Sequence, residues 1–121
     1  MEHAELLGAI ARDRTIDITT TGARSGQLRR IETWGWVDGG TLYLTGSPGR
    51  RDWYANLKAN PELTVHVKRG AQADVPARAR PIEDPAERRA VLSRVAGGYD
   101  LEAWIAGSPL VEVEFPSDWP R

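Results

Sequence analysis

The strongest constraint on the fold is a hairpin signal close to residue 39. Segment 29–37 (RRIETWGWV) alternates between two faces, as a β-strand does, and segment 41–45 (TLYLT) can return as its partner. Between them lie Asp38, Gly39 and Gly40, residue types that tolerate the positive φ angles of a tight turn. The sequence therefore predicts an antiparallel hairpin at this point.

Alternating segments recur elsewhere, and together they predict the fold class. Strands are predicted over 15–21, 63–68, 71–81 and 110–115, and the two middle ones can form a second hairpin through Arg69-Gly70. About six short, mostly antiparallel strands with inserted helices make the chain mainly β (α+β). A barrel or a sandwich is favoured, because a closed sheet has no exposed edges. The order of the strands does not follow from periodicity.

Helices are predicted between these strands. The amphipathic segment 4–12 forms a short N-terminal helix or arm within residues 1–13. Asp84 followed by Pro85 is a helix start with an acidic cap, and that helix should run to about Val95. Segment 99–106 can form one or two further turns, which would bring its aromatic residues toward the protein.

Length and composition limit the architecture and the chemistry. The 121 residues have the size of one domain, with residues 116–121 as a tail, and the absence of cysteine excludes disulfides and thiol chemistry. No apolar run approaches the roughly 20 residues that cross a bilayer, and the first residues lack the features of a signal peptide. We therefore expect a single-domain cytoplasmic protein.

Charge is distributed unevenly although the net charge is only −1. Residues 14–58 hold seven basic and four acidic side chains, which leaves the rest of the chain with an acidic excess. Nucleic-acid binding normally requires a broadly basic domain, so this pattern favours an anionic small molecule as the ligand and no nucleic acid.

Two glycine-containing basic turns are the candidate anion sites. The turn Gly22–Gly26 (GARSG) has glycine at both ends and a cation inside, so it can expose backbone N–H groups to an anion. The turn Ser47–Arg51 (SPGRR) leads into a helix for which Asp52 is a candidate cap and which should stop at 60–61 (Asn-Pro). Arginines at a helix N-terminus suit an anion. Trp53, in that helix, can either flank a flat ring or belong to a core stripe.

Side chains alone offer little catalytic chemistry. The chain has two histidines, and alternation places His66 on the solvent side of its strand, so neither a Ser/His/Asp set nor a metal site is predicted. Glu112 and Glu114 share a strand face whose expected role is the wet side of the sheet. If both basic turns open on one side of a barrel, they form a groove for a flat heterocycle that carries phosphate or carboxylates. The reaction chemistry would then belong to a cofactor.

Four segments, in this order and spacing, resemble the deazaflavin-dependent nitroreductase family. They are 19–29 (TTTGARSGQLR), 38–47 (DGGTLYLTGS), 52–64 (DWYANLKANPELT) and 99–104 (YDLEAW). The resemblance implies a split β-barrel related to oxidases that bind flavin mononucleotide (FMN). It also implies a reduced 8-hydroxy-5-deazaflavin coenzyme that passes hydride to a small-molecule electron acceptor, namely a quinone, a nitroaromatic or another conjugated compound.

The same resemblance implies site residues. It assigns the cofactor's phosphate and acidic tail to Arg24, Ser25, Gly26 and Arg29, the surroundings of the ring to Thr45 and Gly46, and the other side of the cofactor to Ser47, Trp53 and Asn56. The loop before the helix is shorter than in many relatives, and Arg50 and Arg51 can supply basic charge there. Tyr99 matches a region that shapes the acceptor pocket, as a substrate contact or proton donor.

Three alternatives stay open at this point. The same barrel could use FMN in place of deazaflavin, or the protein could bind a cofactor or lipid-like ligand without turning it over. The segment around Gly97 and Gly98 is short, so the acceptor pocket is either open or completed by a second copy of the chain in a homodimer.

Overall fold

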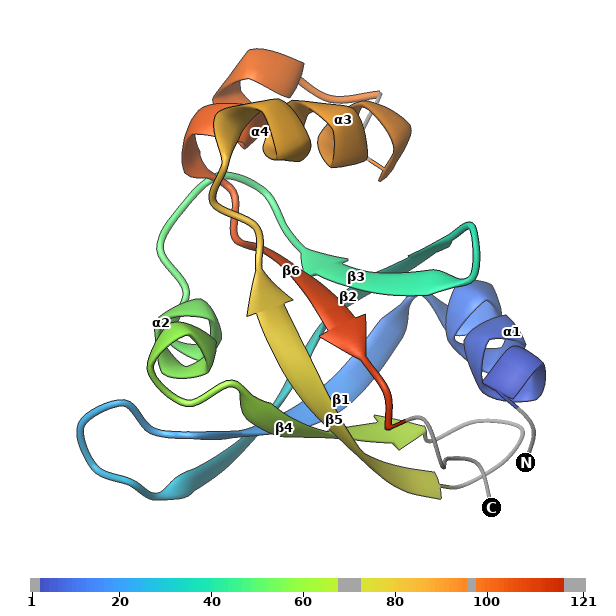
Figure 1. Ribbon diagram of the computed structural model, residues 1–121, viewed down its shortest axis with the longest axis vertical. Helices are drawn as coiled ribbons and strands as arrows, with labels where there is room; N and C mark the ends of the chain where they lie inside the picture. The colour runs from blue at the N-terminus through green and yellow to red at the C-terminus, as the bar shows by residue number, and fades with distance from the viewer. Residues whose placement is uncertain (1–2, 68–72, 96–97, 117–121) are drawn as a thin grey trace.

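The chain folds into a closed β-barrel with helices on its outside (Figure 1). The computed structural model describes residues 3–67, 73–95 and 98–116. In chain order the elements are α1 (His3–Asp13), β1 (Thr15–Thr21), β2 (Leu28–Asp38), β3 (Thr41–Thr45), α2 (Asp52–Ala59), β4 (Glu62–Val67), β5 (Ala73–Pro81), α3 (Pro85–Val95), α4 (Leu101–Gly107) and β6 (Leu110–Glu114).

The strands follow the order β1-β2-β3-β6-β5-β4, and β4 pairs with β1 to close the barrel. Every pairing is antiparallel. The predicted fold class, a split β-barrel of about six antiparallel strands with inserted helices, is therefore confirmed. Closure depends on the pairing of strands far apart in sequence, which alternation within one strand does not reveal.

The hairpin predicted at residues 38–40 joins β2 to β3. Gly39 and Gly40 have φ angles of 57° and 79°, the left-handed values that two-residue hairpin turns require. Asp38 pairs with Thr41 across this turn. The second predicted hairpin is present as the β4–β5 pair, and its turn at Arg69-Gly70 lies outside the described residues.

Alternation along the strands sends one face into the barrel. Ile18, Val65, Val75 and Leu44 have essentially no exposed surface, and they lie on four different strands. Helix α1 covers part of this core with Leu6 and Ile10, which are also fully buried. On β2, Gly35 leaves room for close packing, since a Cβ there would lie 3.2 Å from Leu42 and 3.4 Å from Ile10.

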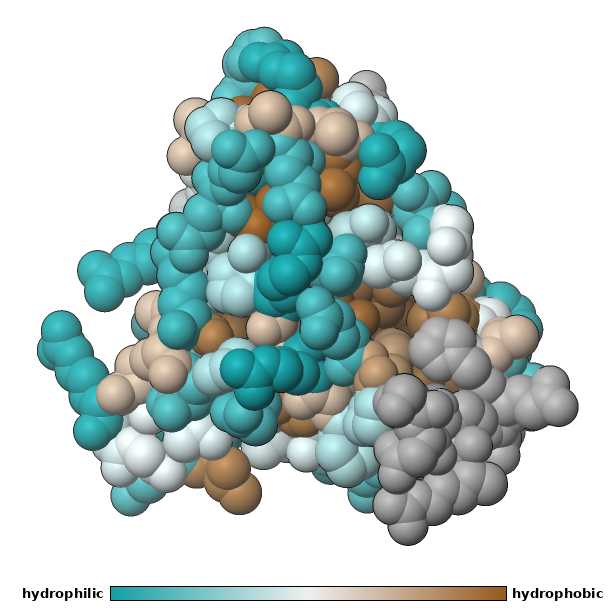
Figure 2. Space-filling model, in the orientation of Figure 1, coloured by the Kyte–Doolittle hydropathy of each residue, from teal (hydrophilic) through white to brown (hydrophobic). Residues whose placement is uncertain are grey.

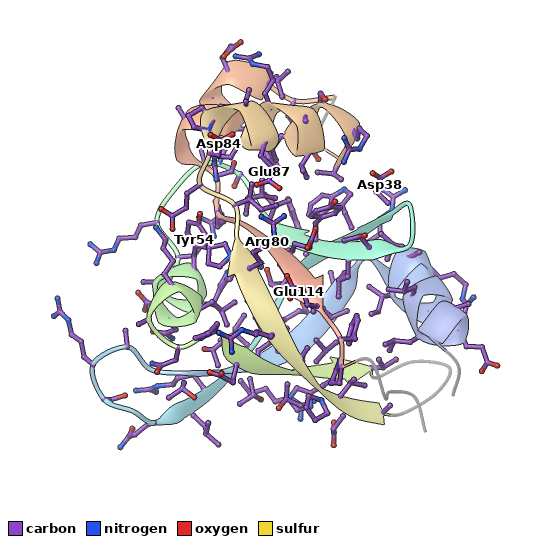
Figure 3. All side chains as sticks on the ribbon, in the orientation of Figure 1. Asp38, Tyr54, Arg80, Asp84, Glu87 and Glu114 are labelled. Atoms are coloured by element: carbon purple, nitrogen blue, oxygen red, sulfur yellow. The ribbon has the colours of Figure 1, made fainter. Side chains whose placement is uncertain are left out.

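A second apolar cluster lies beneath α3 and α4, which sit together at one end of the barrel (Figure 1). Trp104, Leu92 and Ile82 are buried in it. A cross-link joins α3 to the barrel wall, because Arg80 of β5 contacts Glu87 of α3 at 2.7 Å (Figure 3). This hydrogen bond holds the pKa of Glu87 below its usual value.

Of the two predicted acidic caps, one is confirmed and one is wrong. The Glu87 amide donates to the Asp84 carboxylate at 2.9 Å, so the predicted cap of α3 is confirmed, and Asp100 caps α4 in the same way. The prediction that Asp52 caps α2 is wrong. The N-cap position is Arg51, with no side-chain cap hydrogen bond, and Asp52 is the first residue of the helix. The helix therefore begins one residue earlier than local capping preferences indicate.

The prediction that His66 faces solvent is also wrong. His66 lies on the outer face of β4 but is only 9% exposed. Its Nε2 lies 2.6 Å from Thr19 Oγ1 and its Nδ1 lies 2.7 Å from Asp74 Oδ1. Neighbouring strands β1 and β5 supply these partners, and alternation within β4 cannot show them. None of the three side chains lines a cavity of the site below, so we assign them to strand cross-linking.

Glu112 and Glu114 are expected on a solvent-facing side of the sheet. Both carboxylates contact the Arg80 guanidinium, Glu112 at 3.3 Å and Glu114 at 3.9 Å, so Glu112 is more enclosed than that expectation implies. Predicted features at Gly97 and in the tail at 117–121 lie outside the described residues. Among the helices that the structure does describe, none has the length and apolarity to cross a membrane.

Candidate functional site: a basic cleft beside helix α2

A cavity of about 720 Å³ opens where the β1–β2 turn faces α2. These two parts of the chain lie on the same side of the barrel in Figure 1, and long hydrophilic side chains project from this side in Figure 2. The lining residues are Thr20, Gly22, Ala23, Arg24, Ser25, Arg29, Ile31, Arg50, Asp52, Trp53, Ala55 and Asn56. Both predicted basic turns therefore open into one cleft.

Within the described part of the chain, the three arginines of this first cavity have no carboxylate partner. Elsewhere on the surface arginines have carboxylate partners, as Arg78 has Glu62 at 2.8 Å and Arg94 has Asp38 at 2.7 Å. By contrast, the Arg24, Arg29 and Arg50 side chains form no ion pair with any described residue. Asp52 is the one acidic residue among the described residues that line the cavity. The cavity therefore has a net positive charge, which suits an anion.

The β1–β2 turn supplies less backbone than its glycines suggest. The amides of Gly22 and Gly26 donate within the turn, to Gln27 O at 2.8 Å and Gly22 O at 3.0 Å. The Gln27 amide donates to Ser25 Oγ, and the Ala23 amide donates to Asn56. Three amides of the turn and that of the next residue are thus already used. These amides are therefore not available to an anion, and the charge that the turn brings to the cavity is that of the Arg24 side chain.

Asn56 of α2 connects the helix to the opposite wall of the cavity. Its Oδ1 accepts from the Ala23 amide at 3.0 Å, and its Nδ2 donates to Thr20 Oγ1 at 3.2 Å. Both ends of the side-chain amide are therefore occupied by β1 and the turn that follows it. Asn56 lines the cavity as predicted, and its hydrogen bonds set the position of the wall that carries Arg24.

A second cavity of about 300 Å³ adjoins the first, since Ile31 and Trp53 line both. It is lined by Ile31, Glu32, Thr33, Trp34, Thr45, Gly46, Ser47, Arg51 and Trp53. The guanidinium of Arg51 donates to the carbonyl and hydroxyl oxygens of Ser47 at 3.1 and 3.3 Å. Thr45 is buried and donates to the Pro109 carbonyl at 2.6 Å. This cavity therefore combines an aromatic wall with a fixed cation.

Trp53 satisfies both interpretations of its position in the sequence. It is 8% exposed and belongs to the main core cluster with Leu57. The same ring lines both cavities. A core residue at the edge of the barrel thus forms the wall between the two spaces.

The structure brings the predicted cofactor residues together but keeps Tyr99 apart. All of the predicted cofactor residues except Gly26 line one of the two cavities. Gly26 shapes the β1–β2 turn with a φ of 68°. Tyr99 is 55% exposed and stacks on Trp104, with ring centroids 4.7 Å apart, and it lines neither cavity.

Sequence reasoning missed several lining residues. Thr20 lies on the inward face of β1 with Ile16 and Ile18, and a polar residue at a core-facing position near a strand end was a usable signal. Trp34 is 44% exposed on the outer face of β2. Trp34 lines a cavity because the loop at 46–51 lies beside it. Nothing in the sequence around Trp34 predicts this proximity.

The two cavities together suit a ligand that has an anionic part and a flat part. Unpaired arginines can hold phosphate or carboxylate groups through charge-assisted hydrogen bonds. Trp53 and Trp34 offer faces for a planar ring. Among the described residues there is no cluster of His, Asp and Glu that could hold a metal ion. The fold itself is a split β-barrel with antiparallel strands.

Comparison with known proteins gives the family. Residues 4–113 match the family of F420H(2)-dependent quinone reductases. The chain belongs to this family, and it is therefore an oxidoreductase of the deazaflavin-dependent kind. The predicted relation to deazaflavin-dependent enzymes is confirmed. Because this is a family of enzymes, it does not support the alternative of a binding protein without catalytic activity.

Several solved structures share this fold. A structure described as an F420-H2-dependent reductase is 23% identical, with 84% of this chain and 94% of the other covered and a TM-score of 0.56. A structure described as a domain-swapped dimer is 26% identical, with coverage of 84% and 80% and a TM-score of 0.61. An FAD-binding protein from Mesorhizobium loti is 18% identical, with coverage of 97% and 91% and a TM-score of 0.64.

Proposed function

We propose that the protein binds a reduced deazaflavin coenzyme in the basic cleft and directs hydride transfer to a quinone. The observation that carries this proposal is the convergence of Arg24, Arg29 and Arg50 on one cavity without acidic partners among the described residues. Positive charges that converge on one cavity repel each other, and a bound anion reduces this repulsion. The family description names both the reduced cofactor and the acceptor class.

The first cavity would hold the phosphate and acidic tail of the cofactor. Arg24 comes from the β1–β2 turn and Arg29 from the start of β2, while Arg50 comes from the loop before α2. Ligand charge is thus gripped from two separate parts of the chain. The volume of about 720 Å³ is in the usual range for small-molecule sites.

The second cavity would hold the ring and admit the acceptor. Trp53 forms one wall, Gly46 keeps the backbone free of a side chain, and Arg51 is held in place by Ser47. Trp34 remains partly exposed and can stack on a flat acceptor. When bound, the reduced coenzyme supplies the hydride. The chain's own residues bind, orient and shield the reactants. Tyr99 as proton donor stays a prediction.

Titration of the purified protein with the oxidised deazaflavin coenzyme, followed by tryptophan fluorescence, tests the proposal. Saturable quenching is expected because Trp53 and Trp34 line the cavities. In Arg24→Ala the dissociation constant should rise by about tenfold or more, since hydrogen bonds to charged groups are worth about 1.5–3 kcal/mol. The control is Arg12→Ala on α1, which lies across the barrel from α2 (Figure 1).

Turnover is measured with the reduced coenzyme and a panel of quinones and nitroarenes. Oxidation of the coenzyme that depends on enzyme and quinone supports the proposal. An unchanged affinity in Arg24→Ala, or equal losses in Arg24→Ala and Arg12→Ala, contradicts it.

A flavin is the second candidate cofactor, because the FAD-binding protein from Mesorhizobium loti shares this fold. The same arginines could hold the single phosphate of FMN. Competition decides between them: FMN should displace the deazaflavin coenzyme only at concentrations well above the dissociation constant of the coenzyme. A homodimer, as in the domain-swapped structure, is a further proposal that sedimentation of the purified protein checks.

A further inference from the structure

A third cavity, of about 490 Å³, adjoins the first on the side of α2. It is lined by Gly49, Arg50, Arg51, Tyr54, Ala55, Lys58 and Gly107. Arg50 and Ala55 also line the first cavity. The two spaces are therefore neighbours that share a cation, and a ligand long enough to pass Arg50 could occupy both.

The third cavity is more uniformly basic than the first. Arg50, Arg51 and Lys58 contribute positive charge, and none of the described residues that line it is acidic. In the first cavity, by comparison, Asp52 offsets part of the charge. Three cations around one space, without an acidic side chain among its described lining residues, favour a bound anion.

Lys58 is held in place by an aromatic ring, and it has no carboxylate partner among the described residues. Its ammonium group lies 4.4 Å from the centroid of the Tyr54 ring, the geometry of a cation–π contact. Tyr54 itself is fixed against Trp53 in an edge-to-face contact. Such a contact leaves the full positive charge on Lys58 and its remaining N–H groups available to a ligand.

The loop that carries Arg50 is also fixed. The Gly49 amide donates to the Gly107 carbonyl at 3.0 Å, which ties the loop to the end of α4. A Cβ on Gly107 would lie 3.4 Å from Pro48, so glycine here allows the close approach. The shared cation and the lysine are thus presented from two anchored elements, the loop and α2.

We propose that this third cavity is a second anion subsite, which binds a carboxylate or phosphate group with Lys58 and Arg50 as the charged donors. The anion has two chemical sources: an acidic tail that continues from a cofactor held in the first cavity, or a free anion from solution. The first source rests on the proposed function, and the second does not.

The test compares Lys58→Met, which removes the charge and keeps an unbranched side chain, with Arg12→Met, which changes net charge equally on the far side of the barrel. Three probes are titrated by fluorescence: the deazaflavin coenzyme with a tail of several glutamates, the deazaflavin chromophore without phosphate or tail, and a free γ-linked oligoglutamate peptide. Melting temperatures of all variants are measured, since both substitutions lie at exposed helix positions and should leave folding intact.

Each outcome decides the proposal. Lys58→Met should raise the dissociation constant of the long-tailed coenzyme by about tenfold, equivalent to about 1.4 kcal/mol. The dissociation constant of the tail-less chromophore should stay unchanged. If instead the free peptide binds without coenzyme and Lys58→Met abolishes that binding, the subsite serves a free anion. Equal weakening of tailed and tail-less probes, or no effect of Lys58→Met on any probe, overturns the subsite. If neither deazaflavin probe binds the wild-type protein, the proposed function is refuted. Binding of the free peptide, and its loss in Lys58→Met, would still test the subsite.

Discussion

At the scale of single residues, the pairing state of each arginine separates structure from candidate function. Arg30, Arg78 and Arg80 lie on strands, and each contacts a carboxylate of the fold. Arg24 and Arg50, in turns, have no such partner among the described residues. All of these side chains carry the same guanidinium group, so whether an arginine is paired depends on the residues around it. Exposed ion pairs contribute little stability, and the unpaired cations are the better guide to a site.

Asn56 should act on ligand binding through the turn that carries Arg24. In Asn56→Ala the affinity for the deazaflavin coenzyme should fall several-fold and the free energy of unfolding by about 1–2 kcal/mol, because two hydrogen bonds are lost. When Asn56→Ala is added to Arg24→Ala, the further loss of affinity for the coenzyme should be close to zero. A double-mutant cycle measures this.

The matched control for that cycle is Asn60→Ala, at the end of the same helix, where the backbone and not the side chain makes the capping bond. Additive losses in the cycle would show that Asn56 contacts the ligand directly. Such a result would contradict the positioning role.

At the scale of elements, the α3–α4 pair supports the loop that borders the site. Arg88 of α3 is 7% exposed and donates to four backbone carbonyls, those of Ile82, Trp104, Ile105 and Ser108, at 2.6–3.2 Å. Three of these acceptors belong to the end of α4 or its C-cap, where helix carbonyls have few backbone donors and the helix dipole favours a cation. The Trp104 carbonyl also accepts from the Ser108 amide, and the buried arginine supplies a side-chain donor to all three carbonyls.

Replacing Arg88 by methionine should destabilise the protein by about 3–5 kcal/mol, because buried carbonyls lose their donors at once. Urea denaturation measures the change. Arg89→Met is the control, since Arg89 is exposed and its ion pair with Glu102 lies on the surface. A similar small effect for both variants would show that water replaces the Arg88 contacts.

At the scale of the whole molecule, barrel closure creates the cleft. The β1–β2 turn and the loop before α2 are separated in the chain by strands β2 and β3, and the β1–β4 pairing helps bring α2 back beside β1. The unpaired charges then face one space in a protein whose net charge is only −1. Local field, and not total charge, should therefore govern association with an anion.

Salt should weaken coenzyme binding for this reason. Between about 0.1 M and about 1 M sodium chloride the Debye length falls from about 10 Å to about 3 Å, and the dissociation constant should rise several-fold. The rise should be smaller in an Arg24→Ala/Arg50→Ala double variant, which has less charge to screen. Equal salt dependence in the wild type and the double variant would show that these arginines do not hold the anion.

Sequence by itself determined the local structure: period-two alternation specified the strands, Gly39 and Gly40 specified the hairpin, and Asp84 with Pro85 specified the start of α3. The basic turns also identified Arg24 and Arg50, because charge and glycine content are visible in a linear chain. Tertiary structure alone decided the strand order, the burial of His66 and the use of both Asn56 amide groups. These depend on contacts between segments far apart in the chain, whose free energy no local pattern encodes.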